Sequence, residues 1–331
     1  MSGQSVRRIP GRRTLGRRIA AAAVALAMLA ATSACSSRAS EWDDGRYVIA
    51  GGGANGVYFA YGSELASELS TALDVRMTAE ETAGSVDNLL RVSSGEALLG
   101  FAQGDAAADA VAGEGAFDEP LPVQAVARLY DEYLHIVVRA DSEIETVADL
   151  AGRTVSLGAE NSGVNVIAAR VLDAADVDVA SITDPQLDLG ESIRALESAE
   201  IDGFFWVGGI PTPGIAALAE TTPVRLLSIE QSWVNAVNSR YSDAYRPSDF
   251  PVGLYGLDES EPTMAVPNYL IAAAGTPDDV VRDVLAGLFD ARTRIAQHVP
   301  AAALLDRRQA IFTGPVELHP GAMAYYRAER D

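Results

Sequence analysis

Several residue types on which enzyme chemistry depends are rare in this chain. Among 331 residues there is no lysine, one cysteine and three histidines. Without lysine, the chain has no Schiff-base residue, no phosphate-loop lysine and no lysine general base. With Cys35 as its only thiol, it has no internal disulfide, so the fold must depend on its hydrophobic core. These absences exclude several classes of catalytic and cofactor site.

The histidines and serines give no positive sign of catalysis either. His135, His298 and His319 are far apart in the sequence, and none stands in an HxxxH, HxxE or Cys-His pattern that would place metal ligands on one face. The chain also lacks the GxSxG sequence typical of a hydrolase nucleophile. We therefore expect no metal site, no cofactor and no enzymatic activity.

The charge of the chain is strongly negative. There are 25 basic and 46 acidic residues, which gives a net charge of −21. Six arginines lie within the first 18 residues, so the remainder is more acidic still. A protein with this charge repels nucleic acid and anionic lipid surfaces. We therefore expect no binding of nucleic acid.

The N-terminal region has the pattern of an export signal. An arginine-rich segment precedes an apolar run from Ile19 to Ala31, and small residues follow at 32–34. This run of about 13 residues is shorter than the roughly 20 that span a bilayer. Cys35 would be the first mature residue, as in a bacterial lipoprotein signal whose thiol receives diacylglycerol. We expect residues 1–34 to be removed, residues 35–45 to form a tether, and the domain to lie outside the cytoplasm on a lipid anchor.

Two other interpretations of this region remain open. Cys35 could be an incidental thiol in an ordinary secretory signal, and Arg12-Arg13 also fits twin-arginine export. Both alternatives still place the folded domain outside the cytoplasm.

Strand and helix patterns alternate along residues 46–112. Short β-prone runs cover 46–50, 75–79 and 98–102, and helical periodicity follows each of them. Gly95 closes the second helix, for which Ser85 is a good N-cap. A βαβαβ order predicts parallel strands in a doubly wound sheet, with ligand groups at the carboxyl ends of the strands.

The pattern then repeats in the second half of the chain. Expected strands at 154–157, 187–189 and 204–207 complete another βαβαβ unit, while 123–129 and 134–139 are expected as two adjacent strands. A strand at 263–273 would return the chain to the first sheet, before a long helix capped by Thr276. We therefore expect two lobes, 46–139 plus 262–331 and 140–261, joined by two crossings.

Glycine-rich turns follow several of the expected strands. Gly51, Gly53 and Gly56 satisfy GxGxxG, but this motif alone is weak evidence for a dinucleotide. Small polar turns also occur at 84–85, 103–105, 161–163 and 208–209. Helix N-termini that meet at one cleft can hold a small carboxylate through backbone N–H groups, with no lysine needed. The turns together favour a ligand cleft.

Six sequence blocks resemble one known family. They are residues 51–59, 82–89, 99–105, 127–130 with 134–135, 202–205 with 208–213, and 318–322 with 325–326. In order and content they resemble the TAXI family of TRAP-transporter solute-binding proteins. The resemblance implies a two-lobed α/β fold of the type II periplasmic-binding-protein class. It also implies capture of a small anionic solute, glutamate or a related dicarboxylate, and its delivery to a TRAP-type membrane permease.

The resemblance and the turns together nominate the ligand-binding residues. From the family we carry over Asn55, Val57, Tyr58, Ser85, Gln103, Ser162 and Gly163. To these the residues themselves add Asp105, Arg128, Tyr130 and Gly208, and we also considered Tyr133, Arg139 and Trp206. Arginine binds a carboxylate through two parallel hydrogen bonds. His319, beside Pro320 and Gly321, is interpreted as structural.

Two alternative functions are compatible with the same fold. The loaded receptor could signal to a membrane sensor such as a kinase, or the scaffold could be an exported enzyme. The enzyme would need a group of perturbed acidity in the cleft, for which Asp105 is the candidate.

Overall fold

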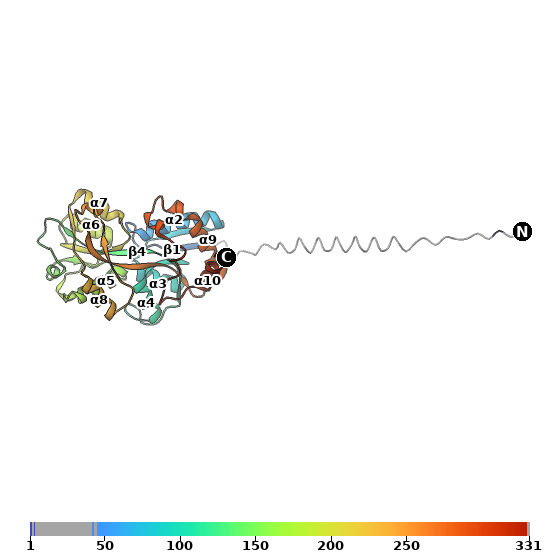
Figure 1. The fold of residues 1–331 in the computed structure, drawn as a ribbon, viewed down its shortest axis with the longest axis horizontal. Coiled ribbons are helices and arrows are strands. Elements are labelled where there is room, and N and C mark those ends of the chain that lie inside the picture. Colours follow the sequence, from blue (N-terminus) through green and yellow to red (C-terminus); the bar gives the residue numbers. More distant parts are fainter. Residues whose placement is uncertain (2, 4–41, 43–44, 330–331) are drawn as a thin grey trace. The chain divides into compact units, whose positions relative to one another are not determined.

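The computed structural model describes residues 1, 3, 42 and 45–329 (Figure 1). Cys35 and the apolar run of the expected signal lie outside these residues. Within the described part, no helix is long and apolar enough to cross a membrane.

Strands and helices alternate along most of the domain. The strands are β1 (Arg46–Ala50), β2 (Arg76–Glu80), β3 (Leu99–Gln103), β4 (Val123–Arg139), β5 (Val155–Ser156), β6 (Gly203–Gly208), β7 (Val224–Leu226), β8 (Arg246–Phe250) and β9 (Glu261–Ala273). The α-helices are α2 (Val57–Leu73), α3 (Ser85–Ser94), α4 (Gly104–Ala112), α5 (Gly163–Ala174), α6 (Leu189–Glu197), α7 (Pro213–Thr221), α8 (Gln231–Arg240), α9 (Asp278–Ile295) and α10 (Pro320–Ala328). Short 3₁₀ helices are η1 (Val147–Leu150), η2 (Val179–Ser181), η3 (Leu254–Gly256) and η4 (Pro300–Leu304).

All nine strands named above belong to one mixed sheet in the order β2-β1-β3-β9-β4-β6-β5. The β1 end is parallel, because β1 pairs in parallel with both β2 and β3, which confirms the predicted βαβαβ order. The long strands β9 and β4 run antiparallel in the middle, and β5 pairs in parallel with β6 at the other end. β7 pairs with β4, and β8 pairs with β9. The sheet is therefore continuous through β4 and β9.

Three of the expected strands differ from the structure. The runs at 123–129 and 134–139 form the single strand β4, whose pairing with β9 shifts register between Arg128 and Asp131. Residues 187–189 are not a strand, because Asp188 caps α6 in a reciprocal capping box with Glu191. Helix α9 begins one residue later than expected, with Pro277 rather than Thr276 at its N-cap.

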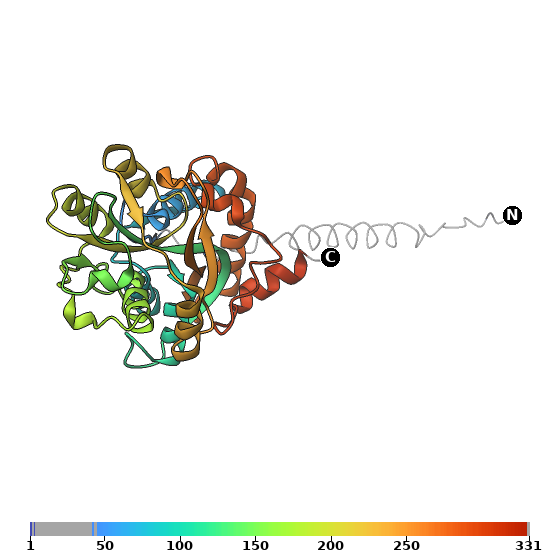
Figure 2. The ribbon, with the colours of Figure 1, turned by 60° about the vertical axis from the view of Figure 1, so that its left-hand side comes forward.

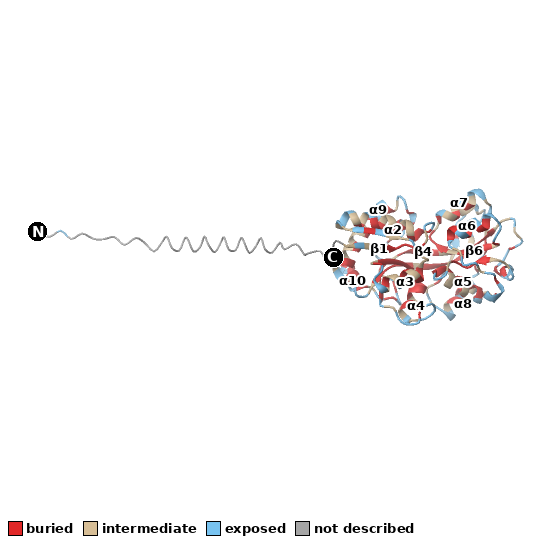
Figure 3. Cartoon of the chain, turned by 180° about the vertical axis from the view of Figure 1, so that it is seen from behind, coloured by how far each residue is buried: buried red, intermediate tan, exposed pale blue. Residues whose placement is uncertain are grey.

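The helices cover both faces of the sheet at both ends and thereby create four hydrophobic cores. α2, α9 and α10 cover one core at the β1 end, and α3 and α4 cover the other. At the β6 end, α5 and α8 cover one core and α6 and α7 the other, a grouping that Figure 1 shows. Figure 2 shows the same elements from a second side, and Figure 3 shows that buried residues concentrate along the strands and the inward helix faces.

Strand alternation distributes side chains between opposite cores. In β1, Ile49 enters the core under α2 while Ala50 enters the core under α3. In β6, Phe205 enters the core under α5 and Phe204 the core under α6. Each strand therefore needs apolar residues on both faces, which explains the nearly continuous apolar runs.

The chain passes from one pair of cores to the other within β4 and again within β9. In β4 the change falls between Tyr130 and Leu134, and in β9 between Val266 and Tyr269. The residue boundaries of the two lobes stay a prediction.

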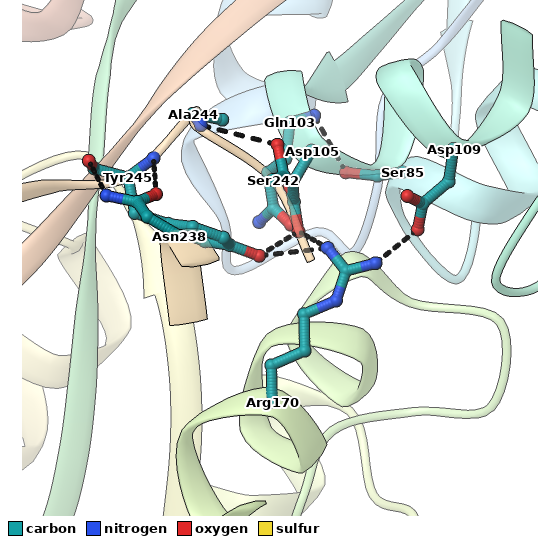
Figure 4. Close-up of polar contacts among 9 residues, drawn as sticks. All are labelled: Ser85, Gln103, Asp105, Asp109, Arg170, Asn238, Ser242, Ala244 and Tyr245. Carbon is teal, nitrogen blue, oxygen red and sulfur yellow. Dashed lines mark hydrogen bonds and ion pairs between the residues drawn. The ribbon is translucent and has the colours of Figure 1, made fainter. Parts of the chain in front are cut away.

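A buried ionic cluster joins the two ends of the sheet (Figure 4). Arg170 on α5 donates to Asp105 on α4 at 3.0 Å, and also pairs with Asp109 one turn further along α4. The Tyr245 hydroxyl donates to the same Asp105 oxygen at 2.5 Å. Burial raises the pKa of Asp105, and the charge of Arg170 opposes that shift. We call these four residues the Arg170 cluster.

Removing the cation from this cluster should destabilise the domain. Arg170→Ala leaves two carboxylates buried without a counter-charge, so the free energy of unfolding should fall by about 3–5 kcal/mol in urea denaturation. The folded-state pKa of Asp105 would rise further above its unfolded value. The loss of unfolding free energy in Arg170→Ala should therefore be greatest at alkaline pH. It should shrink as the pH falls and the carboxylates take up protons.

Arg327→Ala is the matched control, because Arg327 is exposed and makes no ion pair among the described residues. Its unfolding free energy should change by no more than about 0.5 kcal/mol. An Arg170→Ala protein as stable as this control, or one whose deficit grows on acidification, would show that the cluster does not act as described.

Candidate functional site

A cavity of about 130 Å³ lies at the carboxyl ends of β1, β2 and β3 and faces residues from the β6 end of the sheet. Its walls include the loop 52–58, the loop 81–85, Gln103, the turn 158–164 and the segment 187–190. Since about 10–15 Å³ of such space holds one water, the cavity has room for on the order of ten waters. That volume suits a small metabolite.

Five helices begin at the wall of this cavity. Their N-cap residues are Gly56 for α2, Gly84 for α3, Gln103 for α4, Ser162 for α5 and Asp188 for α6. All five N-caps line the cavity. The first turn of each helix has backbone N–H groups without intrahelical partners and a partial positive charge. At α6 the carboxylates of Asp188 and Glu191 already accept from such groups, so the donors available to an anion lie at the starts of α2, α3, α4 and α5.

Glycine allows the walls to approach one another. Gly84 has a φ of +126°, a conformation that side chains strongly disfavour. A Cβ on Gly163 would overlap the Gln103 Oε1 atom and would lie 2.8 Å from Ser85 Oγ. The absence of a side chain at Gly163 therefore lets the start of α5 contact the loops of the β1 end.

The floor of the cavity contains a buried carboxyl group. Glu132, in the middle of β4, is only 1% exposed. Its Oε2 accepts hydrogen bonds from Tyr58 Oη at 2.9 Å and Gln103 Nε2 at 3.2 Å, and its Oε1 accepts one from Tyr130 Oη at 3.3 Å. Burial raises the pKa of Glu132 to about 7, although the hydrogen bond from Tyr58 lowers it.

One cation lines the cavity among the described residues. Arg194, on α6, lies at the wall and makes no side-chain hydrogen bond or ion pair in the described part of the chain. The other charged lining residues, Glu81, Glu132 and Asp188, are acidic. Arg194 is therefore the available counter-charge for an anionic ligand.

Seven of the eleven nominated ligand-binding residues line the cavity. They are Asn55, Val57, Tyr58, Ser85, Gln103, Ser162 and Gly163. Trp206, which we had also considered, lines it as well, with its ring against Gly56. The ligand-binding role of these residues stays a prediction.

The other four nominated residues lie outside the cavity. Asp105 is held in the Arg170 cluster, and Arg128 pairs with Asp131 on a different groove. Tyr130 is buried behind the wall and donates to Glu132, while Gly208 packs against the indole of Trp206. Each was nominated from a turn or strand position that does not determine the direction of the side chain.

Two further candidates have local partners. Arg139 pairs with Asp141, so it is not available to a ligand. His319 caps α10, where its Nδ1 accepts from Gly321 N at 3.1 Å, in agreement with its structural interpretation.

Sequence reasoning missed Glu132 and Arg194. A usable signal existed for Glu132, because Asp131 and Glu132 interrupt an otherwise apolar β run and alternation directs one of them inward. No comparable signal marks Arg194, which looks like an ordinary surface residue of an amphipathic helix. Within the described residues, no group of three His, Cys, Asp or Glu side chains is arranged to hold a metal ion.

Comparison with protein families identifies the chain. Residues 49–329 match the model of the NMT1-like family. This chain belongs to the NMT1-like family. The match covers nearly all of the described residues of this NMT1-like protein.

Solved structures with the same architecture are distant in sequence. MatC from Rhodopseudomonas palustris, solved with malate, is 16% identical, with 86% of this chain and 95% of MatC covered and a TM-score of 0.55. A periplasmic transporter is 12% identical, with 86% of this chain and 92% of the transporter chain covered and a TM-score of 0.51. An ancestral arginine-binding protein bound to arginine is 13% identical, with 77% of this chain and 98% of the arginine-binding protein covered and a TM-score of 0.50. These similarities confirm the predicted α/β periplasmic-binding-protein-like fold.

The contact at Gly163 gives a direct test of the cavity geometry. Gly163→Ala should force Gln103 or the start of α5 to move, and overpacking of this kind lowers the unfolding free energy by about 1–3 kcal/mol. Urea denaturation measures the change.

Gly275→Ala is the control, since no atom lies within 4 Å of the Cβ position. It should leave stability unchanged or raise it by up to about 1 kcal/mol. Equal stability of the two alanine variants would contradict the close contact at Gly163.

Proposed function

We propose that this NMT1-like protein is an extracytoplasmic receptor that binds a small carboxylate and delivers it to a TRAP-type membrane permease. The observation that carries the proposal is the meeting of the N-termini of α2, α3, α4 and α5 with Arg194 at one small cavity. Backbone N–H groups and an unpaired guanidinium together form a carboxylate site that needs no lysine. The TAXI-like sequence blocks support the TRAP-type partner and favour glutamate among the carboxylates.

Related folds support a small carboxylate as the ligand class. MatC was solved with malate and the ancestral arginine-binding protein with arginine, both of which contain a carboxylate. Capture would not require catalysis, because binding need only favour the state in which the walls close around the solute. The enzyme alternative loses its candidate group, since Asp105 lies outside the cavity in a buried ion pair.

Thermal shifts against a ligand panel test the proposal. Amino acids, dicarboxylates, oxoacids and nucleotides would each be added to the purified protein. A ligand at 100 times its dissociation constant adds about 2.7 kcal/mol of stability, so a carboxylate, glutamate first among them, should raise the melting temperature clearly. A shift with nucleotides alone would contradict the proposal and restore the dinucleotide interpretation.

The role of Arg194 predicts a specific loss of affinity. Arg194→Gln removes a charge-assisted hydrogen bond worth about 1.5 kcal/mol or more, so the dissociation constant for the active carboxylate should rise about tenfold in calorimetry. Arg308→Gln, at an exposed arginine distant from the cavity lining, should leave it unchanged. Equal affinities of the two variants for the carboxylate would show that Arg194 does not bind the ligand.

The lipid anchor has an independent test. If Cys35 receives diacylglycerol, Cys35→Ser should move the protein from the membrane fraction to the soluble extracytoplasmic fraction. A Cys35→Ser protein that stays firmly in the membrane fraction would contradict lipid attachment at this residue.

A further inference from the structure

The floor of the cavity presents hydrogen-bond acceptors, whereas its walls present donors. Glu132 accepts from three neutral groups, the hydroxyls of Tyr58 and Tyr130 and the amide of Gln103. It takes part in no ion pair among the described residues. A buried carboxylate without a counter-charge is costly, and such groups normally pair with a cation. The described residues supply none here.

A second acceptor lies beside this carboxylate. The Gln103 side chain is 2% exposed, and its Oε1 has no hydrogen-bond partner. Glu132 fixes the orientation of this amide, because Nε2 must face the carboxylate to donate to it. This buried Oε1 atom therefore faces the start of α5 at Gly163, and Gln103 and Gly163 are both residues that line the cavity. A buried acceptor without a partner calls for a donor from outside the chain.

Among the described residues, the groups around Glu132 supply no positive charge, although one of them, Asn268, has an unpartnered amide donor of its own. α2 contributes Tyr58, α3 contributes Ser85, β3 contributes Gln103, β4 contributes Tyr130 and β9 contributes Asn268, all of them neutral. The negative charge of Asp105 on α4 raises the pKa of Tyr58, as does the negative charge of Glu132. Neither tyrosine is ionised at neutral pH, because burial raises the pKa of both. The local field around Glu132 thus favours a positive group.

We infer that the cavity floor, through Glu132 and Gln103 Oε1, binds a primary ammonium group, so that the ligand is an amino acid rather than a plain dicarboxylate. An ammonium has three donors, enough to reach both acceptors at once. The carboxylate of the same molecule would meet the helix N-termini and Arg194 on the walls. The inference rests on the proposed function, because it assigns the two ends of the same bound solute.

An ammonium site at Glu132 also predicts that protons are released when the ligand binds. With a pKa of about 7, Glu132 is partly protonated in the ligand-free protein at pH 6, and pairing with an ammonium requires the ionised form. Binding of an amino acid at pH 6 should therefore release protons. A ligand that leaves Glu132 protonated should not release them.

Calorimetry with matched acids tests the inference. The probes are L-glutamate with glutarate and L-aspartate with succinate, pairs that differ in the amine alone. One amino acid should bind at least about 30-fold more tightly than its partner, the factor expected for a buried charge pair at the low end of its range. Its binding at pH 6 should release protons, as measured in buffers of different ionisation enthalpy.

The variant Glu132→Gln should weaken amino-acid binding by at least about 30-fold, abolish proton release and leave the affinity of the matching dicarboxylate within about threefold. Glu259→Gln is the control, since Glu259 is an exposed glutamate that does not line the cavity, and it should change neither affinity by more than about threefold. Circular dichroism would establish that both variants fold.

The outcomes separate the inference from the proposed function. Equal affinity of the protein for an amino acid and its dicarboxylate, or an equal loss of both in Glu132→Gln, would overturn the ammonium site and leave the carboxylate receptor intact. Binding of none of the four acids, together with no thermal shift from any carboxylate of the wider panel, would overturn the proposed function and the inference with it.

Discussion

The pairing of β4 with β9 is the constraint on which the rest of the structure depends. These two long antiparallel strands belong to the cores at both ends of the sheet, so they fix where the loops of the two ends face each other. Glu132 lies where β4 passes from one pair of cores to the other, opposite Val266 of β9. A carboxyl group at this position reaches the cavity floor and is still enclosed by packed strands.

Burial of polar groups then determines the character of the site. The cavity gathers helix N-termini that attract negative charge, while its floor keeps an unpaired acceptor and a carboxylate that attract positive charge. Residues of both sets line the same small cavity, so one zwitterionic solute can satisfy both. The Arg170 cluster holds α4 against α5 beside this arrangement and contributes no group to the cavity.

Much of this architecture could be predicted from the sequence, because it follows from local pattern. Apolar runs and glycine turns located β1, β2, β3, β6 and β9, and the same turns located most of the helix starts that line the cavity. Side-chain direction could not be predicted in the same way. Asp105 lies two residues after the cavity-lining Gln103, yet it turns to Arg170, which is 65 residues away in sequence. Arg194 approaches the cavity only because α6 packs there.

A crystal structure of the protein with its tightest-binding small acid tests the central claim most directly. We predict ligand density in the cavity, with the carboxylate within hydrogen-bond distance of backbone N–H groups at two or more helix N-termini and near Arg194. A ligand bound outside this cavity, or one inside it whose carboxylate contacts none of these groups, would contradict the account.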